Sequence, residues 1–396
     1  MTGHGKGRER LDAVVAGGGV VGAACALALA RAGLEVTLVE PRPAPRWAAA
    51  QPDLRVYALA PDNAGLLERL GVWPQVRAAR AQPYRRMRVW DAAGGGELRF
   101  DAASMAREEL GWIVENDLLA DRLWAALAAA GVQVRSPARV EAMEQDAAGV
   151  RLRLDDGSRL EARIAVAADG AGSDLRRLAG LELDAHDYRQ RGVVAYIETE
   201  NPHEDTAWQR FLPTGPLALL PYADGRSSIV WTLPEDEAVR VLALDDEAFA
   251  VALTDASAAR LGRAAPVSPR VAFPLRRQLV RQQAAGRVQV LGDAAHVVHP
   301  LAGQGVNLGL RDVAALLTEV EAARARGSDW TAGHRLQRWA RRRRSDNTVS
   351  AYAFEGINRL FSNADPLATL ARGPLLGLAG KLPPLRSALW RHAAGI

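Results

Sequence analysis

Two glycine-rich stretches, far apart in the chain, carry the residue spacings that are most typical of chemistry. The first is GGGVVG at 17–22, which follows the apolar run LDAVVA and opens the alanine- and leucine-rich stretch CALALARAG. It satisfies G-x-G-x-x-G between a strand and a helix, the pattern that holds the pyrophosphate of a dinucleotide. Gly17 permits the tight turn, Gly19 lets the backbone approach a phosphate, and Gly22 lets helix and strand pack closely.

Glu40 ends the next predicted strand, EVTLVE, eighteen residues after Gly22. A carboxylate there accepts hydrogen bonds from ribose hydroxyls and disfavours a 2′-phosphate. The helix that starts after the glycines supplies N–H groups and a partial positive charge for phosphates. The alternative is a glycine-rich turn that binds no ligand. It would not explain why a strand, a glycine loop, a helix and a strand-end acid occur together in this order. The fingerprint by itself does not distinguish NAD from FAD.

The second stretch is GDAAHVVHPLAGQGVNLGL at 292–310, which follows the predicted buried strand RVQVLGD. Asp293 stands at the end of that strand, where it could cap a helix or bind a ligand. His296 and His299 are three residues apart without a nearby pair of carboxylates, which is a weak metal signal, so we expect no metal site. We interpret His296 as a structural residue beneath the loop.

The apolar periodicity and the turn residues predict the elements that position these stretches. We expect a strand–helix–strand unit over 11–40, a helix over 61–71 capped by Asp62 or Asn63, a hairpin over 85–100, and a helix through Ala130 capped by Asp117. Short strands should follow over 132–167 and 188–280, with long helices over 305–326 and about 330–361. Nucleotide-type segments therefore enclose a strand-rich middle, so the nucleotide-binding domain should be discontinuous.

Bulk composition excludes several classes of protein. The chain has 396 residues, 48% hydrophobic and 24% charged, with a net charge of +4 and scattered arginines, which argues against a nucleic-acid partner. Its one cysteine, Cys25, allows neither a disulfide framework nor a cysteine-rich metal site. We see no signal peptide and no apolar run long enough for a membrane span. We therefore expect a cytoplasmic protein.

Further stretches resemble the flavoprotein aromatic hydroxylases of the para-hydroxybenzoate hydroxylase superfamily. They are DLRVYAL (53–59), VAADGAGSDLRR (166–177) and the stretch at 292–310. The segments GWIVEND (111–117) and AWQRFLPTGPLALLPY (207–222) make the chain similar to that superfamily's ubiquinone-biosynthesis hydroxylases, the UbiH/UbiF/UbiI group. The resemblance covers essentially the whole chain.

The resemblance implies FAD as cofactor and assigns roles to matching positions. Gly17, Gly19, Gly22 and Glu40 would bind its adenosine diphosphate half, with Arg55 near the ribose and pyrophosphate. Asp293 would bind the ribityl chain, and Asp169 lies in the motif thought to bridge FAD and the reduced nicotinamide donor. Pro300 should lie against the flavin ring, and His299 is a second candidate near flavin or substrate. The amides that open the long helix should face the pyrimidine edge of the flavin; they belong to Gly303, Gln304, Gly305, Val306 and Asn307.

The activity that the resemblance implies is an NAD(P)H- and O₂-dependent FAD monooxygenase. NAD(P)H reduces FAD, O₂ gives a C4a-hydroperoxide, and oxygen passes to the aromatic ring of a polyprenylated phenol in ubiquinone biosynthesis. The sequence names no catalytic base. Two alternatives stay open: hydroxylation of a small soluble aromatic substrate, and a flavin-free scaffold subunit of a biosynthetic complex.

The predicted fold class is α/β, with a Rossmann-like FAD-binding domain of the glutathione-reductase βαβ type, an inserted β-sheet substrate domain and a C-terminal helical region. The FAD-binding domain should comprise 1–75, 111–180 and 286–330, the substrate domain 76–110 and 181–285, and the helical region 331–396. Apolar residues of the middle strands are candidates for the substrate pocket, although alternation in a sheet makes most of them plain core. They are Trp208, Phe211, Leu217, Leu219, Leu220, Pro221 and Trp231.

The C-terminal region is basic and apolar, with Arg338, Arg341–Arg344 and Trp339 close together. Such a segment can lie on an anionic membrane, or it can pack on its own domain with a solvated arginine face. We favour the packed helix and keep peripheral contact with the inner membrane, or with a ubiquinone-biosynthesis complex, as a hypothesis. The sequence allows a homo-oligomer without fixing the oligomeric state.

Overall fold

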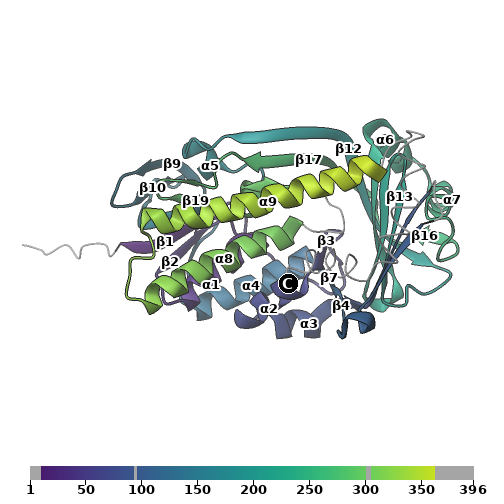
Figure 1. Cartoon of the computed structure of the whole chain (residues 1–396), viewed down its shortest axis with the longest axis horizontal. Coiled ribbons are helices and arrows are strands. Elements are labelled where there is room, and N and C mark those ends of the chain that lie inside the picture. The colour runs from purple at the N-terminus through teal and green to yellow at the C-terminus, as the bar shows by residue number, and fades with distance from the viewer. Residues whose placement is uncertain (1–9, 93–95, 300–304, 362–396) are drawn as a thin grey trace, which may run out of the picture.

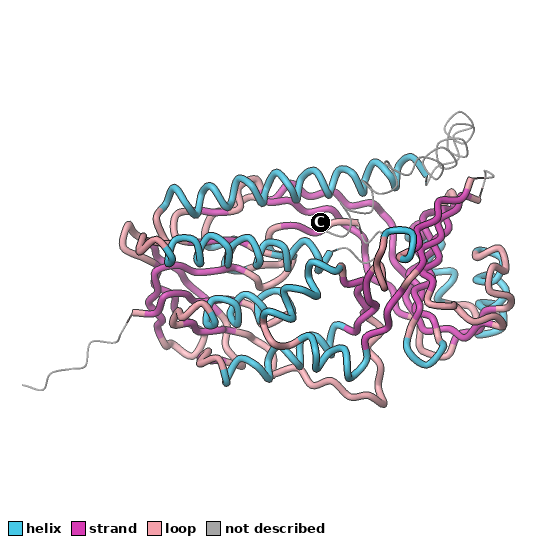
Figure 2. Tube along the Cα trace, turned by 60° about the horizontal axis from the view of Figure 1, so that its bottom comes forward, coloured by secondary structure: helices cyan, strands magenta, loops and turns pink. Residues whose placement is uncertain are grey.

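The computed structural model describes residues 10–92, 96–299 and 305–361 of the chain. One part of the molecule is built around rows of helices, and the other end is dominated by a single sheet (Figures 1 and 2). Two long strands, β12 (Leu183–Thr199) and β17 (Val271–Val280), run between the two parts along the top of Figure 1. The predicted fold class, an α/β protein with an inserted β-sheet region, is confirmed.

The first sheet has a parallel centre. Strands β19, β11, β1, β2 and β8 lie in that order, and each neighbouring pair is parallel. The last four residues of β1, Ala13 to Ala16, are buried, as expected for a central strand that is covered on both faces. The eight strands are β1 (Leu11–Ala16), β2 (Val36–Val39), β8 (Gln133–Arg135), β9 (Val140–Gln145), β10 (Val150–Leu154), β11 (Arg159–Ala167), β18 (Ala284–Ala285) and β19 (Val288–Val290).

Helices pack on this sheet and on one another. Helix α1 (Val20–Arg31) follows β1, so the predicted strand–helix–strand unit is confirmed. It packs against α4 (Asn116–Ala129) and α8 (Gly305–Ala325), with α9 (Gly333–Phe361) alongside α8 (Figure 1). The shared core includes Leu27, Leu123, Leu310 and Trp339, all buried. Of the described helices, none is both long and apolar enough to cross a membrane.

The second sheet has nine strands in the order β20-β17-β12-β15-β14-β13-β5-β6, with β16 beside β12. Helices α6 (Glu235–Leu242) and α7 (Asp246–Ala256) cover one face and bury a core that includes Phe249. Strands β5 and β6 form the predicted hairpin. The remaining bounds are β5 (Arg86–Asp91), β6 (Glu97–Asp101), β13 (Thr206–Leu212), β14 (Gly215–Pro221), β15 (Ser227–Pro234), β16 (Ala264–Pro266) and β20 (His296–Val297).

A three-stranded antiparallel sheet joins the two parts. Its strands are β3 (Val56–Leu59), β7 (Gly111–Glu115) and β4 (Ala81–Tyr84), in that order. Ala58 and Ile113 pack with Leu220 of the nine-stranded sheet, whereas Leu59 and Val114 belong to the helical core. Because β3 follows the loop that carries Arg55, this sheet also positions that residue.

Short elements complete the described chain. They are α2 (Pro61–Arg69), α3 (Trp73–Arg80), α5 (Asp174–Leu178) and the 3₁₀ turns η1 (Ala103–Met105), η2 (Ala223–Gly225) and η3 (Gly292–Ala294). The predicted side-chain caps were wrong. Helix α2 is capped by the backbone of Ala60, and Asp117 lies inside the first turn of α4. Proline at the first position of α2 fixes the helix start without a side-chain cap.

The division into domains stays a prediction, and the sheets show how the strands are shared. Strand β20, from the segment assigned to FAD binding, pairs with β17 of the nine-stranded sheet. Helix α9 begins the predicted C-terminal helical region, whose residues 362–396 lie outside the described part of the chain.

Candidate active site

Four loops leave the carboxyl ends of neighbouring parallel strands and meet at one edge of the first sheet. They start at Gly17 after β1, Glu40 after β2, Ala168 after β11 and Gly292 beyond β19. The Gly17 N–H donates to the carbonyl of Val39 at 2.8 Å, which ties the first two loops together. Open α/β sheets bind ligands in the crevice outside such strand ends.

The three fingerprint glycines have different surroundings. Gly17 has a φ of +102°, and a Cβ there would lie 2.2 Å from the carbonyl oxygen of Ala168. A Cβ on Gly22 would lie 1.9 Å from the Gly17 carbonyl oxygen. A Cβ on Gly19 would meet nothing within 4 Å. Gly17 and Gly22 are therefore required by the protein's own packing, whereas Gly19 borders open space, as a backbone that cradles a phosphate must.

Glu40 is buried beside the glycine loop. Its Oε2 accepts from the Gly18 N–H at 2.6 Å, and its Oε1 accepts from the backbone and side chain of Arg42 at 3.0 and 3.1 Å. The Trp124 indole N–H donates to the Gly18 carbonyl at 2.6 Å and fixes the other side of the loop. A carboxylate has about four lone-pair sites, so Oε2 can still accept a ribose hydroxyl.

The two helices that follow the glycine-rich stretches, α1 and α8, have no acidic side chain in their first turns. Helices α2 and α4 carry Asp62 and Asp117 there. An acid in the first turn neutralises the positive end of the helix dipole. In the first turns of α1 and α8, no acidic side chain offsets the positive end of the helix dipole, which suits an anionic group.

The two glycine-rich stretches lie against each other. Gly292 has a φ of +57°, and a Cβ there would lie 3.1 Å from Cγ1 of Val21. A Cβ on Gly309 of α8 would lie 2.6 Å from Cγ2 of Val21 and 3.1 Å from the Gly292 Cα. Glycine at both positions lets α1, α8 and the turn at 292 approach closely. The stretches therefore form one site rather than two.

Asp293 and Arg55 face each other at this junction. The Arg55 Nη2 lies 3.9 Å from the Asp293 Oδ2, and the two side chains are 63% and 44% exposed. A pair this long and this exposed contributes little to stability. Folding stability therefore does not account for the placement of the two charges, and both have room to bind a ligand.

Asp169 follows β11 and organises the next loop. Its carboxylate accepts from the Ser173 hydroxyl and from the Leu175 N–H, the latter at 3.1 Å. Ser173 in turn caps α5 by accepting from the Arg176 N–H at 3.0 Å. Asp169 thus has a structural role in the start of α5, and its predicted contact with FAD and the nicotinamide donor stays a prediction.

Arg176 is buried and joins two of the four loops. Its Nη1 donates to the carbonyls of Ala171, at 3.1 Å, and of Ala294, at 2.9 Å. Burial lowers the pKa of this guanidinium. Two carbonyl partners nevertheless give the cation charge-assisted hydrogen bonds, so the loop after β11 and the turn that carries Asp293 are held in register.

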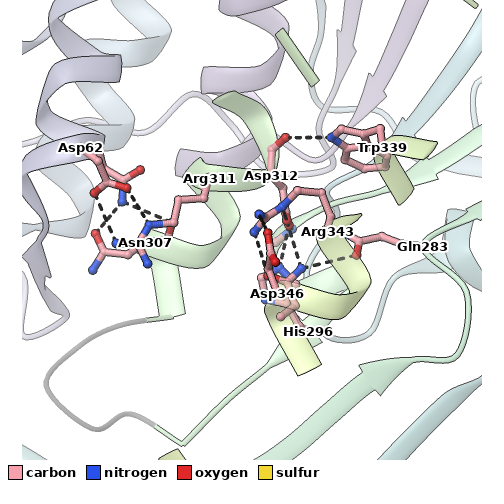
Figure 3. Close-up of polar contacts among 12 residues, drawn as sticks. Asp62, Gln283, His296, Asn307, Arg311, Asp312, Trp339, Arg343 and Asp346 are labelled. Atoms are coloured by element: carbon pink, nitrogen blue, oxygen red, sulfur yellow. Dashed lines mark hydrogen bonds and ion pairs between the residues drawn. The ribbon is translucent and has the colours of Figure 1, made fainter. Parts of the chain in front are cut away.

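Helix α8 is clamped on one side by Asn307 (Figure 3). The Asn307 Oδ1 accepts from the Ala60 N–H at 2.9 Å and from the Asn63 side chain at 2.8 Å, and its Nδ2 donates to the Ala58 carbonyl at 2.8 Å. Its side chain therefore fixes α8 to β3 and α2, and its carbonyl also accepts from the Asn63 side chain at 3.2 Å. The predicted contact of Asn307 with the flavin stays a prediction. Gly305 and Val306 open the helix, and Pro300, Gly303 and Gln304 lie outside the described residues.

On the other side of α8, the buried Asp312 is the centre of a polar cluster (Figure 3). Its Oδ2 accepts from the Gly292 N–H at 3.1 Å and lies 2.6 Å from His296 Nε2. Its Oδ1 accepts from Arg343 Nε at 2.8 Å and from Asn347 Nδ2 at 3.1 Å, both in α9. Burial alone would raise the pKa of this carboxyl, but His296 and Arg343 outweigh burial and lower the pKa to about 2.

This cluster was not predicted from the sequence. A charged residue within the apolar stretch of α8 is the signal that could have indicated it, because an isolated buried carboxylate needs partners. The basic segment around Arg338 packs on α8, as we favoured from the sequence, and its arginines divide between buried and exposed positions. Arg343 and Trp339 point inward, Arg338 pairs with Glu319 of α8, and the exposed members include Arg341 and Arg344.

His299 is buried, and its ring meets Tyr188 of β12 edge-on, with centroids 5.3 Å apart. Among the described residues, neither ring nitrogen has a hydrogen-bond partner. Burial lowers the pKa of His299 to about 4, so the imidazole is neutral at pH 7. A neutral imidazole can donate from one nitrogen and accept at the other.

A second buried polar group lies at the junction of the sheets. Glu115 is fully buried and accepts from Arg80 at 3.3 Å and from the Asp53 N–H at 2.9 Å. Arg80 also donates to the Tyr222 hydroxyl at 2.8 Å, and the Tyr196 hydroxyl donates to the Asp53 carbonyl at 2.6 Å. Burial raises the pKa of Tyr222 to about 12. These bonds tie the loop before Arg55 to the nine-stranded sheet.

The apolar candidates of the middle strands divide between two faces. Trp208, Leu217, Leu219 and Trp231 share the core under α6 and α7. Phe211 packs toward β5 and β6, and Leu220 packs on the three-stranded sheet. Alternation along the strands therefore leaves only Phe211 and Leu220 of these six on the face away from α6 and α7.

The described residues fit FAD. The open space at Gly19 and the N-terminus of α1 suit a pyrophosphate, and Glu40 suits a ribose. Asp293 and Arg55 form a long, exposed pair at the junction, so both can also contact a ligand. When bound, FAD supplies the electron transfer and oxygen chemistry. The residues at the four strand ends would bind and orient the cofactor, and the placement of the neutral His299 near flavin or substrate stays a prediction.

Comparisons with known proteins show the family to which the chain belongs. The family described as FAD binding domain matches residues 10–345. The chain is 36% identical over 390 residues to 3-demethoxyubiquinol 3-hydroxylase of Escherichia coli, covering 97% of this chain and 98% of that one. It is 36% identical over 385 residues to ubiquinone hydroxylase UbiL of Rhodospirillum rubrum, covering 97% and 89%.

The fold is also similar to that of p-nitrophenol 4-monooxygenase PnpA from Pseudomonas putida, with a TM-score of 0.77 at 20% identity over 97% of this chain and 98% of that one. The two sequence matches cover nearly the full length of this chain and most of each relative. They therefore include the strand-rich middle as well as the nucleotide-binding segments. This chain is an FAD-dependent monooxygenase and belongs to the family of ubiquinone-biosynthesis hydroxylases.

Proposed function

We propose that the enzyme hydroxylates the aromatic ring of a polyprenylated phenol in ubiquinone biosynthesis, with NAD(P)H as electron donor and O₂ as co-substrate. The observation that carries this proposal is the near-complete match to a hydroxylase that acts on demethoxyubiquinol. A match confined to the FAD-binding part would have left the substrate open, because that part is common to enzymes with many substrates.

We further propose how the chain holds FAD. The loop at 17–22 and the N-terminus of α1 bind the pyrophosphate, and Glu40 binds the adenosine ribose. Asp293 binds the ribityl chain, and Arg55 neutralises charge beside it. The start of α8 faces the flavin, where a helix N-terminus stabilises negative charge on a reduced ring. What supports these roles is the convergence of the four loops and the absence of acids from both helix starts.

Complementation tests the substrate. We expect the gene to restore ubiquinone synthesis in one of a set of bacterial strains that each lack one ring hydroxylase. Mass spectrometry of the quinone intermediates then names the ring carbon, because the accumulated precursor disappears. A flavin-loaded enzyme that restores none of the strains, yet couples NAD(P)H oxidation to hydroxylation of small soluble phenols, would contradict the proposal.

We propose that the enzyme meets its lipid substrate by peripheral contact with an anionic membrane. Exposed Arg341 and Arg344 lie on α9 with Val349 and Tyr352, which are 60% and 50% exposed. Basic and apolar side chains together favour the interface of an anionic bilayer. The protein should float with vesicles that contain anionic lipid, and Arg341→Glu with Arg344→Glu should reduce the floated fraction. Full recovery of the original protein in the soluble fraction would contradict this contact.

A further inference from the structure

The turn that carries Asp293 is held from both sides by one carboxylate. Asp312 accepts from the N–H of Gly292, directly before Asp293, and contacts His296, three residues after it. Gly292 has a φ of +57°, a conformation that L side chains rarely adopt. The position of Asp293 therefore depends on where the Asp312 carboxylate lies.

That carboxylate is in turn fixed by α9, a helix that contributes no loop to the strand ends. Arg343 makes three separate bonds: Nε to Asp312 at 2.8 Å, Nη1 to Asp346 at 2.8 Å and Nη2 to Asn347 at 3.0 Å. The Trp339 indole donates to the Asp312 carbonyl at 3.3 Å. The guanidinium is buried and its donors diverge, so its geometry is set by three acceptors at once.

Stability alone does not require a buried charge pair between α8 and α9. Removing both charged groups from water costs free energy, and the attraction between them often does no more than balance this cost. Apolar residues at the same positions would therefore hold the two helices together equally well. Apolar packing is already present through Leu336, Trp339 and Ala340, and Arg338 forms a more exposed pair with Glu319. The buried pair differs from these contacts in reaching the turn at 292.

We propose that Arg343 is a positioning residue for FAD binding: through Asp312 it fixes the Gly292–His296 turn and so the orientation of the Asp293 carboxylate. The inference rests on the role proposed above for Asp293. It makes α9 part of the cofactor site, although α9 lies on the far side of α8 from the first glycine loop.

The test is the affinity of the full-length protein, stripped of flavin, for added FAD, followed by flavin fluorescence. Arg343→Lys keeps the charge, so Asp312 is not left uncompensated, but one ammonium cannot replace three diverging donors. We expect the dissociation constant to rise about tenfold, as for other groups that orient a ligand-binding side chain. Arg338→Lys, on the same helix and paired with the same neighbour helix, should change it by less than about twofold.

Combined variants separate positioning from a general loss of structure. If Arg343 acts through Asp293, Asp293→Ala with Arg343→Lys should bind FAD within about twofold of Asp293→Ala alone. Glu40→Gln with Arg343→Lys should show both losses multiplied, because Glu40 lies in a different loop. Asp312→Asn is a second variant, in which an amide N–H lies against the donors of Gly292 and Arg343. It should weaken FAD binding as Arg343→Lys does, alone and in combination with the other variants.

Two results would overturn the inference in distinguishable ways. If the losses of FAD affinity multiply in the variant that combines Asp293→Ala with Arg343→Lys, Arg343 acts elsewhere and the role of Asp293 stands. Unchanged affinity after Asp293→Ala would overturn the role of Asp293 and this inference with it.

Discussion

Gly17, Gly19 and Gly22 differ in what surrounds the position where a side chain would begin. At Gly22 that position is occupied by the Gly17 carbonyl oxygen, 1.9 Å away, whereas at Gly19 nothing lies within 4 Å. The same residue type is thus required by the fold at one position and borders the proposed pyrophosphate site at the other. Sequence spacing alone assigns all three to the cofactor and cannot separate these reasons.

This difference predicts opposite outcomes for two alanine substitutions. Gly22→Ala should lower the free energy of unfolding of the flavin-free protein by about 1 to 3 kcal/mol, the usual cost of overpacking. Gly19→Ala should leave that free energy within about 0.5 kcal/mol and still weaken FAD binding at least tenfold, because its methyl group enters the space for the pyrophosphate. Urea unfolding and FAD titration measure the two effects. Equal losses of stability would contradict the assignment.

His299 predicts a pH dependence of stability. Its pKa is about 4 in the folded protein and 6.5 when exposed, so the unfolded chain binds more protons between these values. Stability is therefore fully present above pH 6.5 and is lost as the pH falls toward 4. Between pH 7 and pH 5 the original protein should lose about 2 kcal/mol more than His299→Gln. His186→Gln, at an exposed histidine, should retain the full loss, and identical slopes for all three proteins would exclude a neutral, buried His299.

Among the elements, α8 is fixed by polar contacts on two opposite sides. Asn307 bonds to β3 and α2, and Asp312 bonds to the turn at 292 and to α9 (Figure 3). Its bounds, 305–325, were predicted to within one residue from the apolar pattern. Its partners could not be predicted, because a helical period shows which face is buried and not which neighbour covers it.

The Asn307 clamp predicts a large cost for a small change. Asn307→Ala leaves the Ala60 N–H, the Ala58 carbonyl and the Asn63 amide without this partner. Each unsatisfied buried group costs about 1 to 3 kcal/mol, and small shifts of the surrounding structure recover part of that cost. We therefore expect the free energy of unfolding to fall by about 2 to 4 kcal/mol. Asn201→Ala, at an exposed asparagine, should change it by less than about 0.5 kcal/mol in the same urea titration. A loss no larger than that of the control would mean that the clamp does not hold α8.

At the scale of the whole molecule, the proposed FAD site draws on segments from nearly the entire described chain. The loops at 17–22, 40, 168–170 and 292–293 are brought together only because β1, β2, β11 and β19 are neighbours in one parallel sheet. A ligand that touches all four loops binds the folded state alone. FAD binding is therefore coupled to folding of the complete protein.

This coupling predicts stabilisation by the cofactor. At a free FAD concentration of 100 times its dissociation constant, the free energy of unfolding should rise by about 2.7 kcal/mol. FMN at the same concentration should stabilise less, because it lacks the adenosine half that the first glycine loop and Glu40 are proposed to hold. Calorimetric or urea unfolding with each ligand measures the difference. Equal stabilisation by FMN and FAD would contradict the role of the 17–22 loop.

The sequence by itself determined the strand–loop–helix unit, the positions of Glu40 and Asp293, and the family, because turn glycines, apolar periods and strand-end acids act over a few residues. Only the tertiary structure decided that Asp62 and Asn63 contact α8 instead of capping α2. It also decided that the Asn307 side chain bonds to neighbouring elements and that Arg343 is buried. Asp312 and Arg343 are 31 residues apart, and Asp312 and Gly292 are 20. Such pairs form because elements pack at particular angles, and no local pattern in the chain records which polar groups that packing brings together.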